Sequence, residues 1–403
     1  MSELLDRLRA LRGSADPGVR KRDDRHELGF APAATVLGAE LVSDGLGVHL
    51  SHRQRWPVGA RHGAFELGVG DLHPLLTRWA SRGVEAGGRA ASGPDAETAR
   101  QVVYLDTETT GLAGGTGSYA FLVGIGRHVG EGFVVEQVFL PGPEHEPGYL
   151  RALQQRLAGV AAVVSYNGAG FDLPLLRTRF ALHGLDDPLA NVPHLDLLPL
   201  ARRLWRSRLA DCTLGTVERE VLGAKRSSHD VPGSEVPLRY LGFLRSRDAR
   251  PLLGVLEHNR IDIVALAALQ QRIEALLDPL AGIADPVEAH ALGRWSDALG
   301  ETEVALAHFR SAEGQHREAA WEAARLLRRS HRVAEAVERW ERLASHHDPR
   351  AWIELAKHRE HRLGDLAGAL QAVAAARRCG GHLFDDLGRR ERRLRERLDR
   401  AAP

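Results

Sequence analysis

A short apolar segment followed at once by two acidic residues limits the folds open to this chain more than any other feature. Residues 102–105 read Val-Val-Tyr-Leu, and Asp106 and Glu108 come directly after them. A short, β-branched apolar run is typical of a buried strand rather than of a helix. Residues two apart in a strand point to the same face, so the two carboxylates are expected side by side. They would repel each other unless a cation or a proton neutralised them, which points to a divalent-metal site; the alternative is a strand end followed by an ordinary turn acid.

Candidate strands and helices alternate after this segment. Two more strands are expected in residues 119–127 and 132–140, then a helix around 150–157, a strand in 161–166 and a helix from about Phe171. Three strands joined by short turns, followed by alternating helix and strand, predict an α/β fold in which helices cover a central sheet.

Length and composition divide the chain into three predicted parts. A chain of 403 residues suggests two or three domains of about 100–200 residues each. We predict an N-terminal extension over 1–100, an α/β domain over 101–282 and a helical domain over 283–403. The extension is expected to contain an amphipathic helix in 1–12, a small β-rich segment between Gly38 and Gly68 and a flexible linker in 86–96.

The C-terminal part shows a repeat. Three similar pairs, Ala305-Leu306, Ala336-Val337 and Ala369-Leu370, recur every 31 to 33 residues. Helix-turn-helix repeats have a period near 34 residues, so this part resembles a tetratricopeptide-like array, which could dock a protein partner. A plain helical bundle is the alternative.

Charge and cysteine content narrow the classes of function. Fifty-four basic residues against 53 acidic ones give a net charge of +1, which by itself gives no sign of a nucleic-acid partner. All but three of the basic residues are arginines, whose planar side chain suits phosphate. The two distant cysteines cannot build a disulfide framework or a cysteine zinc site. No apolar run reaches the roughly 18 residues of a membrane span, so we expect no membrane contact and a cytoplasmic location.

Two later segments supply further acidic residues and a histidine. The strand pattern over 161–166 is followed by Asn-Gly, and Asp172 stands at the start of a helical pattern. His258 and Asp262 stand four apart in another helical segment, so they share one helix face. Taken singly, Asp172 could be only a helix cap and His258 only a core histidine.

Together the acidic segments resemble the DEDD superfamily of 3′-to-5′ exonucleases, which have a ribonuclease H-like fold. Asp106 and Glu108 match its first motif, Asp172 its second and Asp262 its third. The chain is also similar to the YprB-type ribonuclease H-like family of predicted exonucleases, through segments such as 212–218 and 230–234. The likeness covers roughly residues 100–280 and implies a mixed central sheet with flanking helices.

The resemblance implies a metal-dependent 3′-to-5′ exonuclease that hydrolyses single-stranded DNA or RNA ends by a two-metal-ion mechanism. Asp106, Glu108, Asp172 and Asp262 would hold two Mg²⁺ or Mn²⁺ ions. His258 would take a proton from the attacking water, as a neutral imidazole can near pH 7. The superfamily places a tyrosine four residues, or a histidine five residues, before the last aspartate; here a histidine stands four before it.

Contacts to the nucleic acid are expected at five further residues. Thr107, Thr109 and Asn167 would shape the pocket for the terminal nucleotide, and Arg202 and Arg206 would bind phosphates. Two other functions remain open. One is a catalytically weak or inactive module that binds nucleic acid or docks a protein, and the other is a structure-specific endonuclease with the same metal site.

Overall fold

The chain forms two compact units in a computed structural model that describes residues 29–68, 70–81, 101–111, 117–130, 132–226, 230–277, 285–380 and 386–401. The first unit contains residues up to 197 together with 218–271, and the second contains 198–217 together with 272 onwards. The helix predicted in 1–12 and the linker predicted in 86–96 lie outside the described residues.

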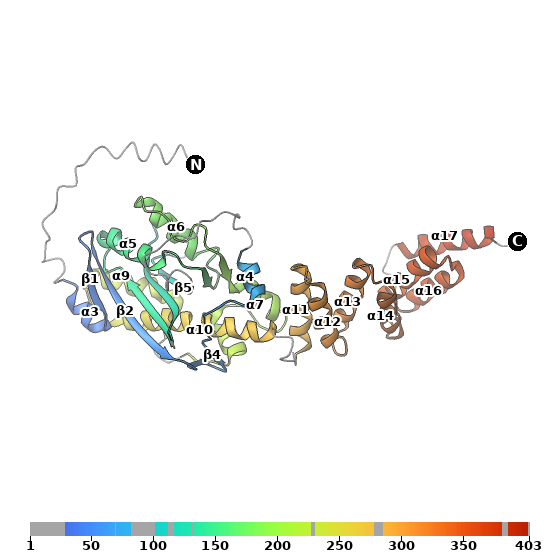
Figure 1. Cartoon of the computed structure of the whole chain (residues 1–403), viewed down its shortest axis with the longest axis horizontal. Helices are drawn as coiled ribbons and strands as arrows, with labels where there is room; N and C mark the ends of the chain where they lie inside the picture. The colour runs from blue at the N-terminus through green and yellow to red at the C-terminus, as the bar shows by residue number, and fades with distance from the viewer. Residues whose placement is uncertain are drawn as a thin grey trace, which may run out of the picture. The chain divides into compact units, whose positions relative to one another are not determined.

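A mixed seven-stranded sheet forms the centre of the first unit (Figure 1). Its strands, in spatial order, are β1 (Glu40–Ser43), β2 (Val48–Pro57), β7 (Gly132–Phe139), β6 (Ala120–Val129), β5 (Val102–Thr109), β8 (Ala162–Ser165) and β9 (His194–Asp196). Neighbours pair antiparallel except β5 with β8 and β8 with β9, which are parallel. The predicted α/β fold with a mixed sheet is therefore confirmed.

The N-terminal strands differ from expectation. β1 and β2 belong to the central sheet, where β2 pairs with β7 over eight positions, and only the hairpin β3 (Arg61–His62) with β4 (Phe65–Glu66) stands apart. Without β2, the buried strand β7 would present an unpaired edge, and a long open edge invites pairing with another chain.

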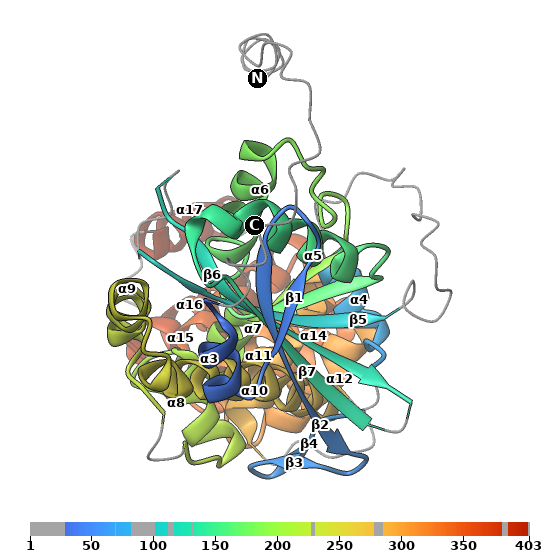
Figure 2. The same ribbon diagram turned by 90° about the vertical axis from the view of Figure 1, so that its left-hand side faces the viewer.

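Helices cover both faces of the sheet. The helices of this unit are α3 (Ala31–Leu37), α4 (Pro74–Ala80), α5 (Glu146–Leu157), α6 (Asp172–Leu182), α9 (Val236–Ser246) and α10 (Leu253–Leu277), with short helical turns at Pro143–His145, Glu218–Leu222, Gly233–Glu235 and Arg250–Leu252. Two adjacent residues of β7 contact helices on opposite faces of the sheet. Glu136 points to Arg156 of α5 at 2.8 Å, and Gln137 points to Asn259 of α10 at 2.9 Å. Figure 2 shows α5 and α10 on opposite sides of the strands.

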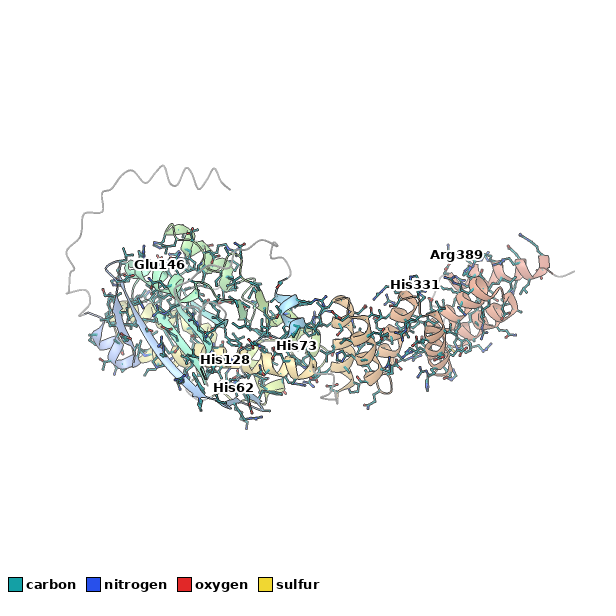
Figure 3. The ribbon with its side chains drawn as sticks, in the orientation of Figure 1. His62, His73, His128, Glu146, His331 and Arg389 are labelled. Carbon is teal, nitrogen blue, oxygen red and sulfur yellow. The ribbon has the colours of Figure 1, made fainter. Side chains whose placement is uncertain are left out.

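A buried ion-pair cluster joins α5 to α6. Glu146, labelled in Figure 3, is 2% exposed and accepts hydrogen bonds from Arg179 Nε at 2.6 Å and from His183 Nε2 at 2.7 Å. Removing one partner of such a buried pair costs about 3–5 kcal/mol, because a charge is left unpaired. The cluster therefore fixes α6, whose first residue is Asp172, relative to the sheet.

The second unit is helical. Its helices are α7 (Leu197–Trp205), α8 (Leu214–Val217), α11 (Pro286–Ala298), α12 (Thr302–Ala312), α13 (Arg317–Arg329), α14 (Val333–Ser345), α15 (Pro349–His358), α16 (Leu366–Arg378) and α17 (Asp386–Ala401), with a π-helical turn at Arg359–Leu363. Ala305, Ala336 and Ala369 lie on α12, α14 and α16 and are fully buried. The repeat read from the sequence thus marks the second helix of three successive pairs, and a tetratricopeptide-like identity stays a prediction. None of the helices in the described ranges combines the length and apolar character needed to cross a membrane.

Candidate active site

Strand β5 presents Asp106 and Glu108 toward helix α10. The amide of Asn259 on α10 donates to Asp106 Oδ2 at 2.8 Å and to the Asp106 main-chain oxygen at 3.2 Å. Asn259 is fully buried, and its Oδ1 accepts a hydrogen bond from Gln137 of β7 at 2.9 Å. A buried polar chain therefore holds the Asp106 carboxylate in one orientation, and the sequence interpretation gave Asn259 no role.

Thr107, the residue after Asp106 on β5, holds the Asp172 carboxylate in place. The main-chain N–H of Thr107 donates to Asp172 Oδ1 at 3.1 Å and the Thr107 hydroxyl donates at 2.5 Å. The Thr109 hydroxyl, on a buried side chain, donates to the main-chain oxygen of Gly111 at 2.9 Å. Both threonines thus have partners within the chain, and their contacts with a nucleotide stay predictions.

The turn between β8 and α6 brings Asp172 to the site. Asn167 adopts the left-handed conformation with φ of 65°, which asparagine tolerates better than most residues. The carboxylate of Asp196 accepts the main-chain N–H groups of Asn167 at 2.8 Å and Ala169 at 3.2 Å. The observed role of Asn167 is to form this turn, and its predicted nucleotide contact remains a prediction.

Helix α10 carries His258 and Asp262 on one face, as their spacing predicts. His258 Nε2 lies 3.7 Å from Asp262 Oδ2, and His258 Nδ1 lies 2.6 Å from Oδ1 of Asp230. Arg226 Nη1, a donor, also lies 3.3 Å from Nδ1, but the contact with Asp230 is much shorter and a carboxylate only accepts, which favours the hydrogen on Nδ1 and the lone pair of the neutral ring on Nε2. Asp230 therefore orients the imidazole.

Arg226 brings a positive charge into the cluster. Its guanidinium donates to Glu218 at 2.6 Å, to Asp230 at 3.3 Å and, in a close ion pair, to Asp262. Glu218 is 1% exposed and also lies 2.7 Å from Nε2 of His62, a residue of β3 that is labelled in Figure 3. The sequence suggested Arg226 only as a possible phosphate contact and gave Asp230 no catalytic role, although Asp230 opens the 230–234 segment of the family likeness.

Burial and mutual repulsion raise the pKa of the acidic residues. Burial raises the pKa of Asp106 well above its usual range, and the neighbouring Asp262, Glu108 and Asp172 carboxylates raise it further. Burial raises the pKa of Glu108 to about 8 against the opposing effect of His258, and that of Asp172 to about 6 against the hydrogen bond from Thr107.

Burial and neighbouring charges also shift the pKa of the two titratable groups on α10, Asp262 and His258. Burial also raises the pKa of Asp262, while Arg226 and His258 oppose the shift. Burial disfavours a charge on His258, yet Asp262, Glu108 and Asp230 together raise its pKa. The site therefore concentrates more negative charge than its own cations neutralise.

The donor set fits a divalent cation. Within the described ranges no three acidic, histidine or cysteine side chains already converge as ion ligands. The carboxylates of Asp106, Glu108, Asp172 and Asp262 are hard oxygen donors, and they influence one another electrostatically. The Arg226 guanidinium, paired with Asp262, stands in for a cation.

The two predicted phosphate-binding arginines lie elsewhere in the chain. Arg202 is on α7 and Arg206 follows that helix, and both belong to the second unit, where they line a cavity. The structure thus brings together the five predicted catalytic residues in the first unit with Thr107, Thr109 and Asn167.

Comparisons with known proteins agree with this fold. The RNase H superfamily, named after a nuclease, matches residues 103–274, which contain all five predicted catalytic residues. The protein YprB of Bacillus subtilis (strain 168), an uncharacterized protein, is 33% identical over 331 residues that span 79% of this chain and 78% of that relative. The chain therefore belongs to the YprB family, with a domain of the RNase H superfamily.

Solved structures show weaker likenesses. A family B DNA polymerase from the hyperthermophilic archaeon Pyrobaculum calidifontis is 17% identical with a TM-score of 0.34, over 52% of this chain and 28% of the polymerase. Exonuclease I of E. coli in complex with a dT13 oligonucleotide is 16% identical with a TM-score of 0.29, over 47% of this chain and 45% of that one. This chain thus spans less than half of either protein.

Proposed function

We propose that this protein is a metal-dependent 3′-to-5′ exonuclease that acts on single-stranded DNA or RNA ends. The observation that carries the proposal is a buried carboxylate cluster beside a histidine whose Nδ1 is held by Asp230 and whose Nε2 faces Asp262. Asp106 is held by Asn259, and His258 is held by Asp230 at 2.6 Å. Membership of the RNase H superfamily supports the same reaction class.

The proposed reaction is hydrolysis of the terminal phosphodiester. His258 Nε2 takes a proton from water as the water oxygen bonds to phosphorus, and the bond from phosphorus to the 3′ oxygen breaks. The 3′ oxygen recovers a proton, and a nucleoside 5′-monophosphate leaves. Asp230 keeps Nδ1 protonated throughout, so that Nε2 remains the accepting atom.

Asp106, Glu108, Asp172 and Asp262 would hold the divalent ions, for which we propose two Mg²⁺ or Mn²⁺. Such ions would lower the pKa of a bound water and stabilise charge on the leaving oxygen. Burial raises the pKa of Glu108 and Asp172 in the absence of a cation, and a cation bound among these carboxylates would favour their ionised form.

One observation favours a catalytically weak module as the second candidate. Arg226 forms a close ion pair with Asp262 and contacts Asp230 at 3.3 Å, so a side chain of the protein already offsets part of the charge that a metal would neutralise. In that case the fold would bind nucleic acid without rapid hydrolysis.

A digestion assay separates these possibilities. The full chain is incubated with 5′-labelled single-stranded DNA and RNA, a 3′-recessed duplex and a circular single strand, with Mg²⁺ or Mn²⁺, beside an Asp106→Asn control. We expect stepwise shortening from the 3′ end that needs the cation and is lost in the control. Cutting of the circle would instead indicate an endonuclease, because a circle has no end.

A thermal-shift measurement tests the cation site without relying on activity. Saturating Mn²⁺ should raise the melting temperature of the wild type, since a ligand at about 100 times its Kd adds about 2.7 kcal/mol of stability. Asp262→Asn should reduce this shift. Equal digestion by wild type and Asp106→Asn, together with no cation-dependent shift in melting temperature, would refute the proposal that this protein is a metal-dependent nuclease.

A further inference from the structure

A basic cavity of about 750 Å³ lies inside the second unit, between α7, α11 and the turn that precedes α13. The titratable side chains that line it are Arg202, Arg203, Arg206, His290, Arg294 and His316. Among the described residues, the rest of the lining is small or apolar and contains no carboxylate. A cavity whose charged groups all have one sign concentrates ions of the opposite sign.

Three of these arginines have no acidic partner among the residues that the structure describes. Among the residues that the structure describes, no acidic side chain pairs with Arg202, Arg206 or Arg294, and all three are exposed. Arginines elsewhere in this unit commonly do pair, as Arg328 does with Glu354 at 2.6 Å. Like charges gathered without partners repel one another, so an anion bound among them would be stabilised.

The walls of the cavity are fixed in place by contacts outside it. Glu288 of α11 is 3% exposed and accepts from Trp205 Nε1 of α7 at 2.6 Å and from Arg272 at 2.7 Å. Arg208 adds an ion pair to Asp285, the residue before α11, at 2.9 Å. Helices α7 and α11 are therefore fixed relative to each other, so the backbone positions that carry the cavity arginines are set before binding.

The two histidines of the cavity lie against each other. Their rings stack with centroids 4.3 Å apart, and His290 Nε2 is buried with no hydrogen-bond partner in the described part of the chain. Burial, and then the positive charges of His316 and Arg294, lower the pKa of His290 to about 4. The site thus disfavours a further positive charge.

We infer that this cavity binds the phosphodiester backbone of a single-stranded nucleic acid. Arg202 and Arg206 lie one helical turn apart, and Arg294 faces the same space from a second helix. The guanidinium fork matches phosphate oxygens in a bidentate manner. A peptide that binds through a large apolar side chain would find no matching pocket, because the apolar lining residues that the structure describes are proline, valine and alanine. That the bound polymer is a single-stranded nucleic acid rests on the proposed nuclease function.

Binding is measured by fluorescence anisotropy with a labelled single-stranded 20-mer and the full chain, in EDTA and at several salt concentrations. The test variant is Arg202→Gln/Arg206→Gln/Arg294→Gln. The control is Arg310→Gln/Arg362→Gln/Arg378→Gln, which removes the same charge from exposed arginines of the same unit outside the cavity. Circular dichroism confirms that both variants fold.

We expect the test variant to lose about tenfold or more in affinity and the control variant much less. The slope of log Kd against log salt should also fall by about 2, since each single-strand phosphate contact contributes about 0.7. Equal losses in both variants would overturn the inference, as would unchanged binding in the test variant. So would equally tight binding of a mononucleotide or of a poly-glutamate peptide by the wild type.

Because this assay contains no divalent cation, it is independent of catalysis. Hydrolysis of bis-p-nitrophenyl phosphate by the wild type reports the acidic cluster separately. Cavity-dependent binding without any hydrolysis would contradict the proposed function alone, and hydrolysis without cavity-dependent binding would contradict the cavity inference alone.

Discussion

The substitution Gly124→Ala tests how the sheet and α10 together position Asp106. Gly124 lies on β6, directly beneath α10. A Cβ atom at this position would lie 2.9 Å from Ile263 Cγ1 and 3.0 Å from the amide carbon of Asn259, and closer still to its Oδ1. Real Cβ contacts essentially never fall below 3.0 Å, so the helix or the Asn259 side chain has to move.

The size of the effect follows from the contacts that would be disturbed. Overpacking a core costs about 1–3 kcal/mol. Displacing Asn259 also breaks its buried hydrogen bonds to Asp106 and Gln137, and an unsatisfied buried group costs about 1–3 kcal/mol. Alanine regains about 0.4–1 kcal/mol through the unfolded chain. These contributions together span about 1–6 kcal/mol, and the middle of that range, about 2–4 kcal/mol, is the expected net destabilisation.

Hydrogen exchange measured by mass spectrometry reads this change peptide by peptide, including the peptides of β5 and β6. At about 1.4 kcal/mol per tenfold change, amides of β5 and β6 that open with the unit should exchange roughly 30 to 1,000 times faster. The control is Gly242→Ala on the exposed face of α9, where a Cβ meets nothing within 4 Å and β6 should be unaffected. Wild-type exchange rates in the β5 and β6 peptides of Gly124→Ala would refute the reasoning.

Two further predictions concern single side chains. Asp230→Ala should lower kcat on a single-stranded oligonucleotide about 10- to 100-fold with little change in KM, because His258 loses the acceptor that holds its Nδ1; an unchanged kcat would remove Asp230 from the mechanism. His49 is 2% exposed, neither ring nitrogen has a partner within the described residues, and burial, then Arg156, lowers its pKa to about 4. Only the unfolded chain takes up this proton between pH 6.5 and 4, so the free energy of unfolding should fall by about 1–2 kcal/mol from pH 7 to pH 5, and His49→Leu should show a smaller fall in urea titrations. The same fall in the variant would assign the effect to other groups.

The local patterns of the sequence determined the elements and the acidic residues on them. The apolar run before Asp106 predicts β5, and the period of two places Asp106 and Glu108 on one face. The spacing of His258 and Asp262 predicts their common helix face. These predictions succeed because each depends on the geometry of a single strand or helix, which a few neighbouring residues specify.

Only the tertiary structure decided which distant residues complete the site. Asn259 and Asp106 are 153 positions apart, and Arg226 and Asp262 are 36 apart. Such pairs meet because α10 packs closely over Gly124 and because the chain around Arg226 turns back toward that helix, neither of which leaves a periodic signal. The addition of β2 to the edge of β7 and the meeting of Arg206 with Arg294 in one cavity have the same origin. Backbone pairing and helix packing between remote segments depend on the surfaces that the whole fold brings together, so only the folded chain specifies them.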